Sequence, residues 1–237
     1  MYFFEDVNII YQILKQQSNY LEESIDTPQT NIFEPVRLNL IFRLPDEETK
    51  ILYDTLNLST QKDFAALIDN TYEIQLRTVL SEGWHEVEHD LRYKCKDELW
   101  WHYCGDDSRM LNGLYATLET AERAMSHLFR NIAYKNYKKQ DWSAMIRNHF
   151  CIRLTSNRLD PFLEEIFNQN KELPKMILRI NRQEFIINIF KIPIAYPLNM
   201  NNLILFANRC FIHNDELKNL ETVAQAQALD KIMDALS

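Results

Sequence analysis

The chain has 237 residues, of which 46% are hydrophobic and 25% are charged, and its formal net charge at pH 7 is −8. This composition is typical of a globular protein with one or two domains, and the acidic balance argues against broad nucleic-acid binding, which needs a basic surface. No stretch approaches the roughly 18 uncharged apolar residues of a membrane span, and the start of the chain has no basic segment typical of a signal peptide.

The counts of cysteine and glycine restrict the chemistry further. Four scattered cysteines form no C-x-x-C pair and no disulfide framework, which favours a reducing, cytoplasmic location. There are only three glycines, Gly83, Gly105 and Gly113, so neither a P-loop nor a Rossmann glycine turn is present. Any phosphate group must therefore be bound by side chains or helix N-termini.

In the first part of the chain, helical periodicity alternates with strand-like alternation. The elements predicted in chain order are a helix over 6–17, a short strand within 18–31, a strand over 36–44, short helices over 47–56 and 61–69, a strand over 72–77 and a helix from residue 78. Thr78 or Ser81 is suited to cap that last helix.

Two of these strands have one apolar and one polar face, because successive side chains in a strand point to opposite sides. The apolar positions are Val36, Leu38, Leu40 and Phe42 in the first strand and Tyr72, Ile74 and Leu76 in the second. The polar positions are Arg37, Asn39 and Arg43, and then Glu73, Gln75 and Arg77. The sequence thus predicts a sheet with one buried side.

From residue 109 onward the pattern is almost entirely helical. We predict helices over 109–136, 141–152, 159–170, 173–190, 199–211 and 214–235, and two domains, 1–140 and 141–237. The aromatic residues expected to form the helical core are Trp142, Phe162, Phe167, Phe185, Phe190, Phe206 and Phe211. The C-terminal helices are also a candidate surface for a homo-oligomer or a partner protein.

The second strand carries the residues that are most suited to chemistry. Glu73, Gln75 and Arg77 place a carboxylate, an amide and a guanidinium on one face. Glu73 is suited to hold a divalent cation or take a proton, Gln75 to bind a base edge or a hydroxyl, and Arg77 to pair with phosphate. The alternative is an ordinary solvated strand face with a cross-strand ion pair.

The helix that follows adds aromatic, acidic and basic residues in rows. Trp84, Glu88 and Arg92 are spaced four residues apart, so they line up along one side of the helix. His85, His89 and Tyr93 have the same spacing and form a row beside them. Leu80, Val87 and Leu91 are the predicted core stripe of this helix.

One short motif in this helix suggests a zinc hydrolase. His85, Glu86 and His89 match H-E-x-x-H, in which two histidines bind zinc and the glutamate acts as a base. Such a site needs a third ligand. The candidates His102, Glu119 and His127 complete no known spacing.

A longer pattern resembles the signature of RelA/SpoT-type alarmone synthetases, E-x-Q-x-R-T, W-x-x-x-E-H and Y-K. The nine positions that match it in register are Glu73, Gln75, Arg77, Thr78, Trp84, Glu88, His89, Tyr93 and Lys94. The resemblance implies transfer of pyrophosphate from ATP to the 3′-hydroxyl of GDP or GTP, while some members of the family act on other nucleotides or on tRNA ends. It also explains both histidines without a metal.

The resemblance implies roles for individual residues and a fold. Glu73 would be the catalytic carboxylate linked to Mg²⁺. The nucleotide-binding set would be Arg37, Gln75, Arg77, His89, Arg92, Tyr93 and Lys94. The implied fold is α+β, with a partial nucleotidyltransferase-like mixed sheet flanked by helices and followed by an all-helical C-terminal region.

The chain departs from the family at two places. It has no D-x-x-G-x-R, the motif that supplies contacts to the donor ATP, so the alternative is a catalytically inactive nucleotide-binding or regulatory module. The family also has Y-R-S-x-H on the strand before E-x-Q, where this chain has Pro35 in place of the tyrosine and Asn39 in place of the histidine.

Overall fold

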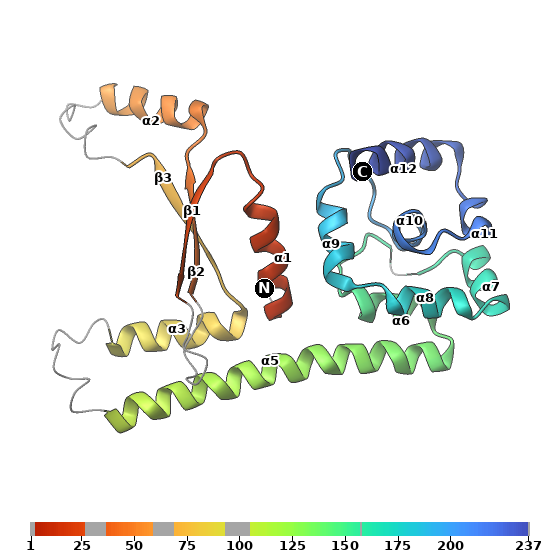
Figure 1. Ribbon diagram of the computed structural model, residues 1–237, viewed down its shortest axis with the longest axis horizontal. Coiled ribbons are helices and arrows are strands. Elements are labelled where there is room, and N and C mark those ends of the chain that lie inside the picture. Colours follow the sequence, from red (N-terminus) through yellow and green to blue (C-terminus); the bar gives the residue numbers. More distant parts are fainter. Residues whose placement is uncertain (1–2, 27–36, 59–68, 93–104, 157, 237) are drawn as a thin grey trace. The chain divides into compact units, whose positions relative to one another are not determined.

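The computed structural model describes residues 3–26, 37–58, 69–92, 105–156 and 158–236. They belong to two compact units, Met1–Arg123 and Ala124–Ser237 (Figure 1). The described part of the first unit contains strands and helices and that of the second contains helices alone, so the fold is α+β with an all-helical C-terminal part. The predicted domain boundary at residue 140 stays a prediction, because α5 (Gly105–Lys139) contributes to both units.

The strands and helices described in the first unit follow the sequence patterns closely. They are α1 (Phe4–Leu14), β1 (Tyr20–Asp26), β2 (Arg37–Arg43), α2 (Asp46–Leu58), β3 (Thr71–Leu76), α3 (Val79–Arg92) and the first part of α5. The helix predicted over 61–69 falls almost wholly outside the described residues.

The three described strands form an antiparallel sheet in the order β1-β2-β3. The mixed sheet that we expected is not seen among them, because the chain reverses direction from each strand to the next. In the central strand, Leu40 pairs with Glu23 of β1 and with Ile74 of β3.

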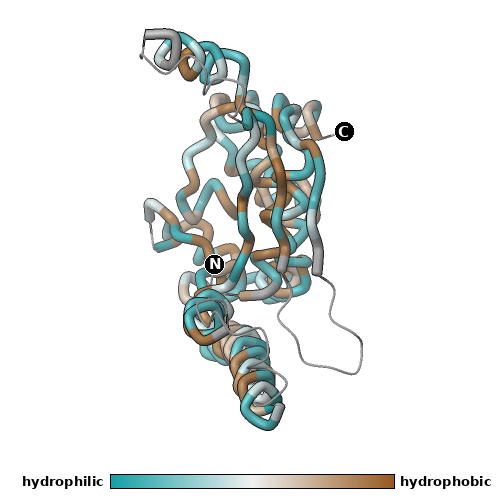
Figure 2. Tube along the Cα trace, turned by 90° about the vertical axis from the view of Figure 1, so that its left-hand side faces the viewer, coloured by the Kyte–Doolittle hydropathy of each residue, from teal (hydrophilic) through white to brown (hydrophobic). Residues whose placement is uncertain are grey.

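The predicted apolar side of the sheet is confirmed. Leu38, Leu40 and Phe42 are buried in β2, and Leu76 is buried in β3. Helix α1 covers this side with Val7, and a row of partly buried residues completes the cluster: Ile10, Tyr11, Leu14, Tyr20 and Ile74. In Figure 2 both hydrophobic and hydrophilic residues occur along these strands. The opposite side of the sheet carries mostly polar residues, with the partly buried Ile41 among them.

The second unit consists of helices around a single apolar core. After the rest of α5 they are α6 (Trp142–Phe150), α7 (Pro161–Gln169), α8 (Glu172–Arg179), α9 (Arg182–Phe190), α10 (Met200–Ala207), the π-helix η2 (Asn208–Ile212), α11 (Asp215–Lys218) and α12 (Val223–Leu236).

Two helices that we predicted as continuous are interrupted. The helix expected over 173–190 is α8 followed by α9, because the Asn181 side chain accepts hydrogen bonds from the backbone amides of Gln183 and Glu184 and starts a new helix. The helix expected over 214–235 is α11 followed by α12, and Thr222 exchanges hydrogen bonds with Gln225 before α12 begins.

The predicted aromatic core is confirmed for most of its members and wrong for two. Trp142, Phe167, Phe185 and Phe206 are buried, and Phe211 packs against them partly buried. Phe162 and Phe190, however, are 71% and 56% exposed. They lie on the outer sides of α7 and α9, whose inner sides are formed by other residues, in α7 by Leu163 and Phe167.

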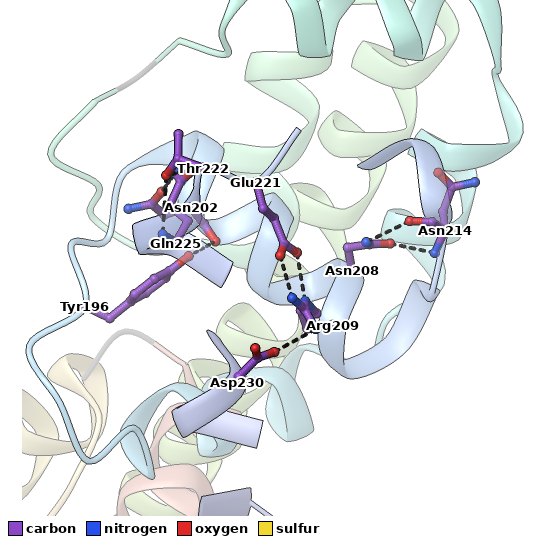
Figure 3. Close-up of polar contacts among 9 residues, drawn as sticks. All are labelled: Tyr196, Asn202, Asn208, Arg209, Asn214, Glu221, Thr222, Gln225 and Asp230. Carbon is purple, nitrogen blue, oxygen red and sulfur yellow. Dashed lines mark hydrogen bonds and ion pairs between the residues drawn. The ribbon is translucent and has the colours of Figure 1, made fainter. Parts of the chain in front are cut away.

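Polar contacts fix the last helices of this unit (Figure 3). Arg209 of η2 makes two hydrogen bonds to Glu221, of 2.8 and 2.6 Å, and an ion pair of 3.0 Å with Asp230 of α12. Asn208 and Asn214 bond to each other reciprocally across the end of η2. These contacts hold α12 and the turn before it against the π-helix.

Candidate functional site

The candidate site begins on the side of the sheet that α1 leaves uncovered. Glu73 and Gln75 are exposed there, and Gln75 Nε2 donates a hydrogen bond of 3.2 Å to Glu73 Oε1. The partly buried Ile74 lies between them and the buried Leu76 follows them, both on the other face of β3. The predicted placement of these two residues on one polar face is confirmed.

Asn39 extends this polar face onto the central strand. It pairs directly with Gln75 of β3 and with Ser24 of β1, and residues paired across antiparallel strands share a face. Asn39 is partly buried, and its Oδ1 atom is buried with no hydrogen-bond partner. The alternation of Leu38, Asn39 and Leu40 signals this placement in the sequence, but not the unmet acceptor.

Arg77 lies just beyond the end of β3. Its side chain is 11% exposed, and Nη1 forms an ion pair of 3.0 Å with Glu82 in the first turn of α3. The guanidinium is therefore fixed at the point where the strand gives way to the helix. Its expected role in phosphate binding stays a prediction.

The start of α3 is capped as the sequence indicates. The Ser81 amide donates to Thr78 Oγ1 and the Thr78 amide donates to Ser81 Oγ, which satisfies two backbone donors at the helix start. The Thr78 hydroxyl also donates to Glu122 of α5, a carboxylate that the sequence did not single out. Burial raises the pKa of Glu122, an effect that the hydrogen bond from Thr78 partly offsets.

Helix α3 buries a different side from the one predicted. Trp84 and Glu88 are buried, and Trp84 packs on Tyr115 and donates a 3.2 Å hydrogen bond to the carbonyl of Leu111 in α5. The core stripe expected from Leu80, Val87 and Leu91 is wrong for its last two members, which are 56% and 46% exposed. The large indole and its polar N–H instead set which side faces α5.

The two histidines of the H-E-x-x-H motif lie on one side of α3. His85 Nδ1 is 3.7 Å from Glu88 Oε2, and the centroids of the His85 and His89 rings are 5.9 Å apart. Within the described ranges, no group of three or more His, Cys, Asp or Glu residues is placed to hold a metal ion. His102 lies outside these ranges, so the zinc alternative stays a hypothesis.

Of the remaining residues predicted for the site, the structure describes only some. His89 lies on α3 and is exposed. Arg37 and Arg92 belong to β2 and α3, but their side chains are outside the described part of the structure, as are Tyr93 and Lys94 entirely. The structure thus brings Glu73, Gln75 and Asn39 together, with Arg77 at the end of the same strand.

The oxygen donors on this face fit Mg²⁺. Glu73 contributes an exposed carboxylate, and Mg²⁺ in nucleotide sites is typically held by one or two carboxylates plus phosphate oxygens and water. Glu73 is therefore the residue on this face that would hold Mg²⁺ beside a nucleotide.

Comparison with known proteins identifies no relative. No protein-family model, curated protein or solved structure matches this chain. Among the described residues, no helix has both the length and the apolar character needed to cross a membrane. What the chain does is therefore inferred from its own residues.

Proposed function

We propose that this chain is a RelA/SpoT-type synthetase domain that transfers pyrophosphate from ATP to the 3′-hydroxyl of GDP, GTP or a related nucleotide. One observation carries the proposal: Glu73 and Gln75, the first two of the nine signature positions, are both exposed on the sheet face opposite α1 and are joined by a hydrogen bond. A carboxylate within hydrogen-bond reach of a hydroxyl is able to take its proton as a general base, and the neighbouring amide helps to hold the carboxylate in place.

Glu73 is the proposed catalytic residue. Its bond from Gln75 occupies one carboxylate oxygen, so the other is left for a metal ion or for the proton of the acceptor hydroxyl. Mg²⁺, when bound there, would neutralise phosphate charge and draw the nucleotide toward this carboxylate. Gln75 thereby has a positioning role as well as its expected place in the acceptor pocket.

Arg77 carries a positive charge directly after the end of the strand that holds Glu73 and Gln75. The guanidinium is held by Glu82 at the end of β3, two residues after Gln75. A charge fixed in advance stabilises phosphate without the cost of reorganising a mobile side chain. The proposal assigns Arg77 to the phosphates of the acceptor nucleotide.

The helix that carries the second half of the signature is anchored before any ligand binds. Thr78 caps α3, and Trp84 holds this helix against α5 through a hydrogen bond to the carbonyl of Leu111. Because pyrophosphate transfer asks the protein mainly to position two nucleotides and offset their charge, such a rigid support suits the reaction. His89, exposed on this helix, belongs to the same proposed pocket.

The test is to incubate the protein with Mg²⁺, ATP and GDP or GTP and to separate the nucleotides by anion-exchange chromatography. We expect a product with pyrophosphate added to the acceptor, and its loss in Glu73→Gln by at least about 100-fold, the usual scale for a general base. The matched control is Glu22→Gln. Glu22 is an exposed glutamate of β1 that pairs with Ile41 of the central strand, as Glu73 of β3 does. Replacement of Glu22 should leave the rate unchanged.

A second candidate function is a nucleotide-binding module without transferase activity. The observation that favours it is the lack of a D-x-x-G-x-R motif, which supplies the donor-ATP contacts in the family that the signature resembles. Binding of GDP or GTP with a defined stoichiometry but without any new nucleotide product would select this candidate. Absence of both binding and product would overturn both.

A further inference from the structure

Asn39 has an unsatisfied hydrogen-bond acceptor on the polar sheet face. Among the described residues of that face, no other buried side-chain atom lacks a hydrogen-bond partner. The Oδ1 atom of Asn39 is buried without a partner, although its neighbours Gln75 and Ser24 are exposed on both sides. A buried acceptor without a hydrogen bond destabilises the folded chain, and a donor from a ligand would remove that cost. The site thus lacks a donor at this position.

The carboxamide of Asn39 is able to reach a ligand. The residue as a whole is partly exposed, and the last side-chain torsion of asparagine is broadly distributed rather than held in a single narrow well. Rotation about that bond exchanges the positions of the carboxamide oxygen and nitrogen, so a hydrogen-bond donor on a ligand favours the orientation in which the oxygen faces it. The ligand must then offer an O–H or N–H group, because the carboxamide oxygen only accepts hydrogen bonds.

The position of Asn39 relative to Glu73 indicates which donor this is. Asn39 pairs with Gln75 and Glu73 pairs with Ile41, so Asn39 and Glu73 are diagonal neighbours on one face. The Cα atoms of diagonal neighbours lie roughly 7–8 Å apart across a sheet, and their Cβ atoms lie somewhat closer. Two vicinal hydroxyls, each making a hydrogen bond of about 2.8 Å to one of the two side chains, span this separation.

We infer that Asn39 determines the sugar specificity of the site by accepting a hydrogen bond from the 2′-hydroxyl of the acceptor ribose while Glu73 acts on the 3′-hydroxyl. The inference rests on the proposed function and deepens it, because it gives the residue by which the site prefers ribonucleotides over deoxyribonucleotides. Asn39 is a specificity residue here, and the proton transfer is left to Glu73.

The experiment compares binding of GDP and of 2′-deoxyguanosine diphosphate by isothermal titration calorimetry in the presence of Mg²⁺. For the natural chain we expect GDP to bind about tenfold more tightly, the usual effect of one hydrogen bond to a buried group. Asn39→Leu should bind both nucleotides with the weaker affinity. Asn39→Asp keeps an acceptor at the same place and should retain the preference for GDP.

Ser24→Ala is the matched control, since Ser24 is the other direct neighbour of Asn39 and its loss should leave the preference intact. Equal affinity of the natural chain for both nucleotides would overturn the inference and leave the proposed function standing, whatever the variants do. Retention of the preference in a folded Asn39→Leu would overturn it as well. Failure of the natural chain to bind GDP at all would instead overturn the proposed function.

Discussion

Thr78, at the beginning of α3, donates its hydroxyl hydrogen to the carboxylate of Glu122, which lies 44 residues later in α5. Both side chains are buried, and the same threonine hydroxyl accepts a hydrogen bond from the backbone amide of Ser81. The contact therefore joins the end of the strand that carries Glu73 and Gln75 to the long helix that supports α3.

Replacement of Thr78 by valine should destabilise the first unit by about 2–4 kcal/mol. The change removes a helix cap, worth about 1 kcal/mol, and leaves the buried Glu122 carboxylate without its donor, at about 1–3 kcal/mol. Chemical denaturation followed by circular dichroism measures the loss. Thr78→Ser keeps the hydroxyl and should recover most of it. Thr120→Val, at an exposed site on α5, is the control and should have little effect.

Replacement of Glu122 by glutamine should raise the free energy of unfolding at neutral pH. Burial raises the pKa of Glu122, so the folded state holds its proton more strongly than the unfolded state does. The charged form therefore lowers stability above that pKa, and the cost disappears as the pH falls below the ordinary value of 4.5. Glutamine retains an acceptor for Thr78 without the charge. Denaturation curves at pH 7 and pH 4 should show the gain at pH 7 only; an equal gain at both would contradict this account.

The second unit should lose stability in mild acid because of His149. Burial lowers the pKa of this histidine to about 4. A hydrogen bond to the backbone of Ile180 acts in the opposite direction, and the smaller effects of the nearby Arg182 and Arg130 charges add to the lowering. The unfolded chain binds the proton near pH 6.5, so the contribution of neutral His149 is complete above that pH and is lost as the pH falls toward 4.

The shift corresponds to a loss of roughly 3 kcal/mol between pH 7 and pH 4. Hydrogen exchange of the amides in α6, measured across this range, reports the local stability. In His149→Asn, which does not titrate, the part of the pH dependence due to this residue should vanish. His127→Gln removes an exposed histidine from α5 and should leave the dependence as it is. A natural chain whose α6 protection is flat from pH 7 to pH 4 would refute the assignment.

Arg209 should contribute much more to stability than its exposed partner Asp230 does. The Glu221 side chain is 2% exposed and that of Asp230 is 62% exposed. Arg209→Met leaves the buried Glu221 charge without its partner and should cost about 3–5 kcal/mol. Asp230→Asn breaks only an exposed ion pair and should cost less than about 1 kcal/mol. Thermal denaturation of both variants measures the two losses of stability. Similar losses would show that the burial of the partner does not determine the strength of these ion pairs.

Local patterns predicted the elements of the first unit well. The alternation in residues 36–44 gave the buried side of β2, and the polar residues of 72–77 gave the face that holds Glu73 and Gln75. Such patterns follow directly from the period of the backbone, so they need no knowledge of distant residues. The break at Asn181 was missed because apolar spacing continues across it, while the capping bonds that end one helix and start the next depend on side-chain geometry.

By itself, the sequence singled out the candidate residues and determined on which face of a strand Glu73 and Gln75 lie, because a two-residue period and a short motif are local properties. Only the tertiary structure decided that Trp84 and Glu88, rather than Val87 and Leu91, turn toward α5, that Thr78 meets Glu122, and that Asn39 stands beside Gln75 with an unmet acceptor. These contacts join residues far apart along the chain, and which of several helix sides is buried depends on the shape and polarity of the partner that packs on it.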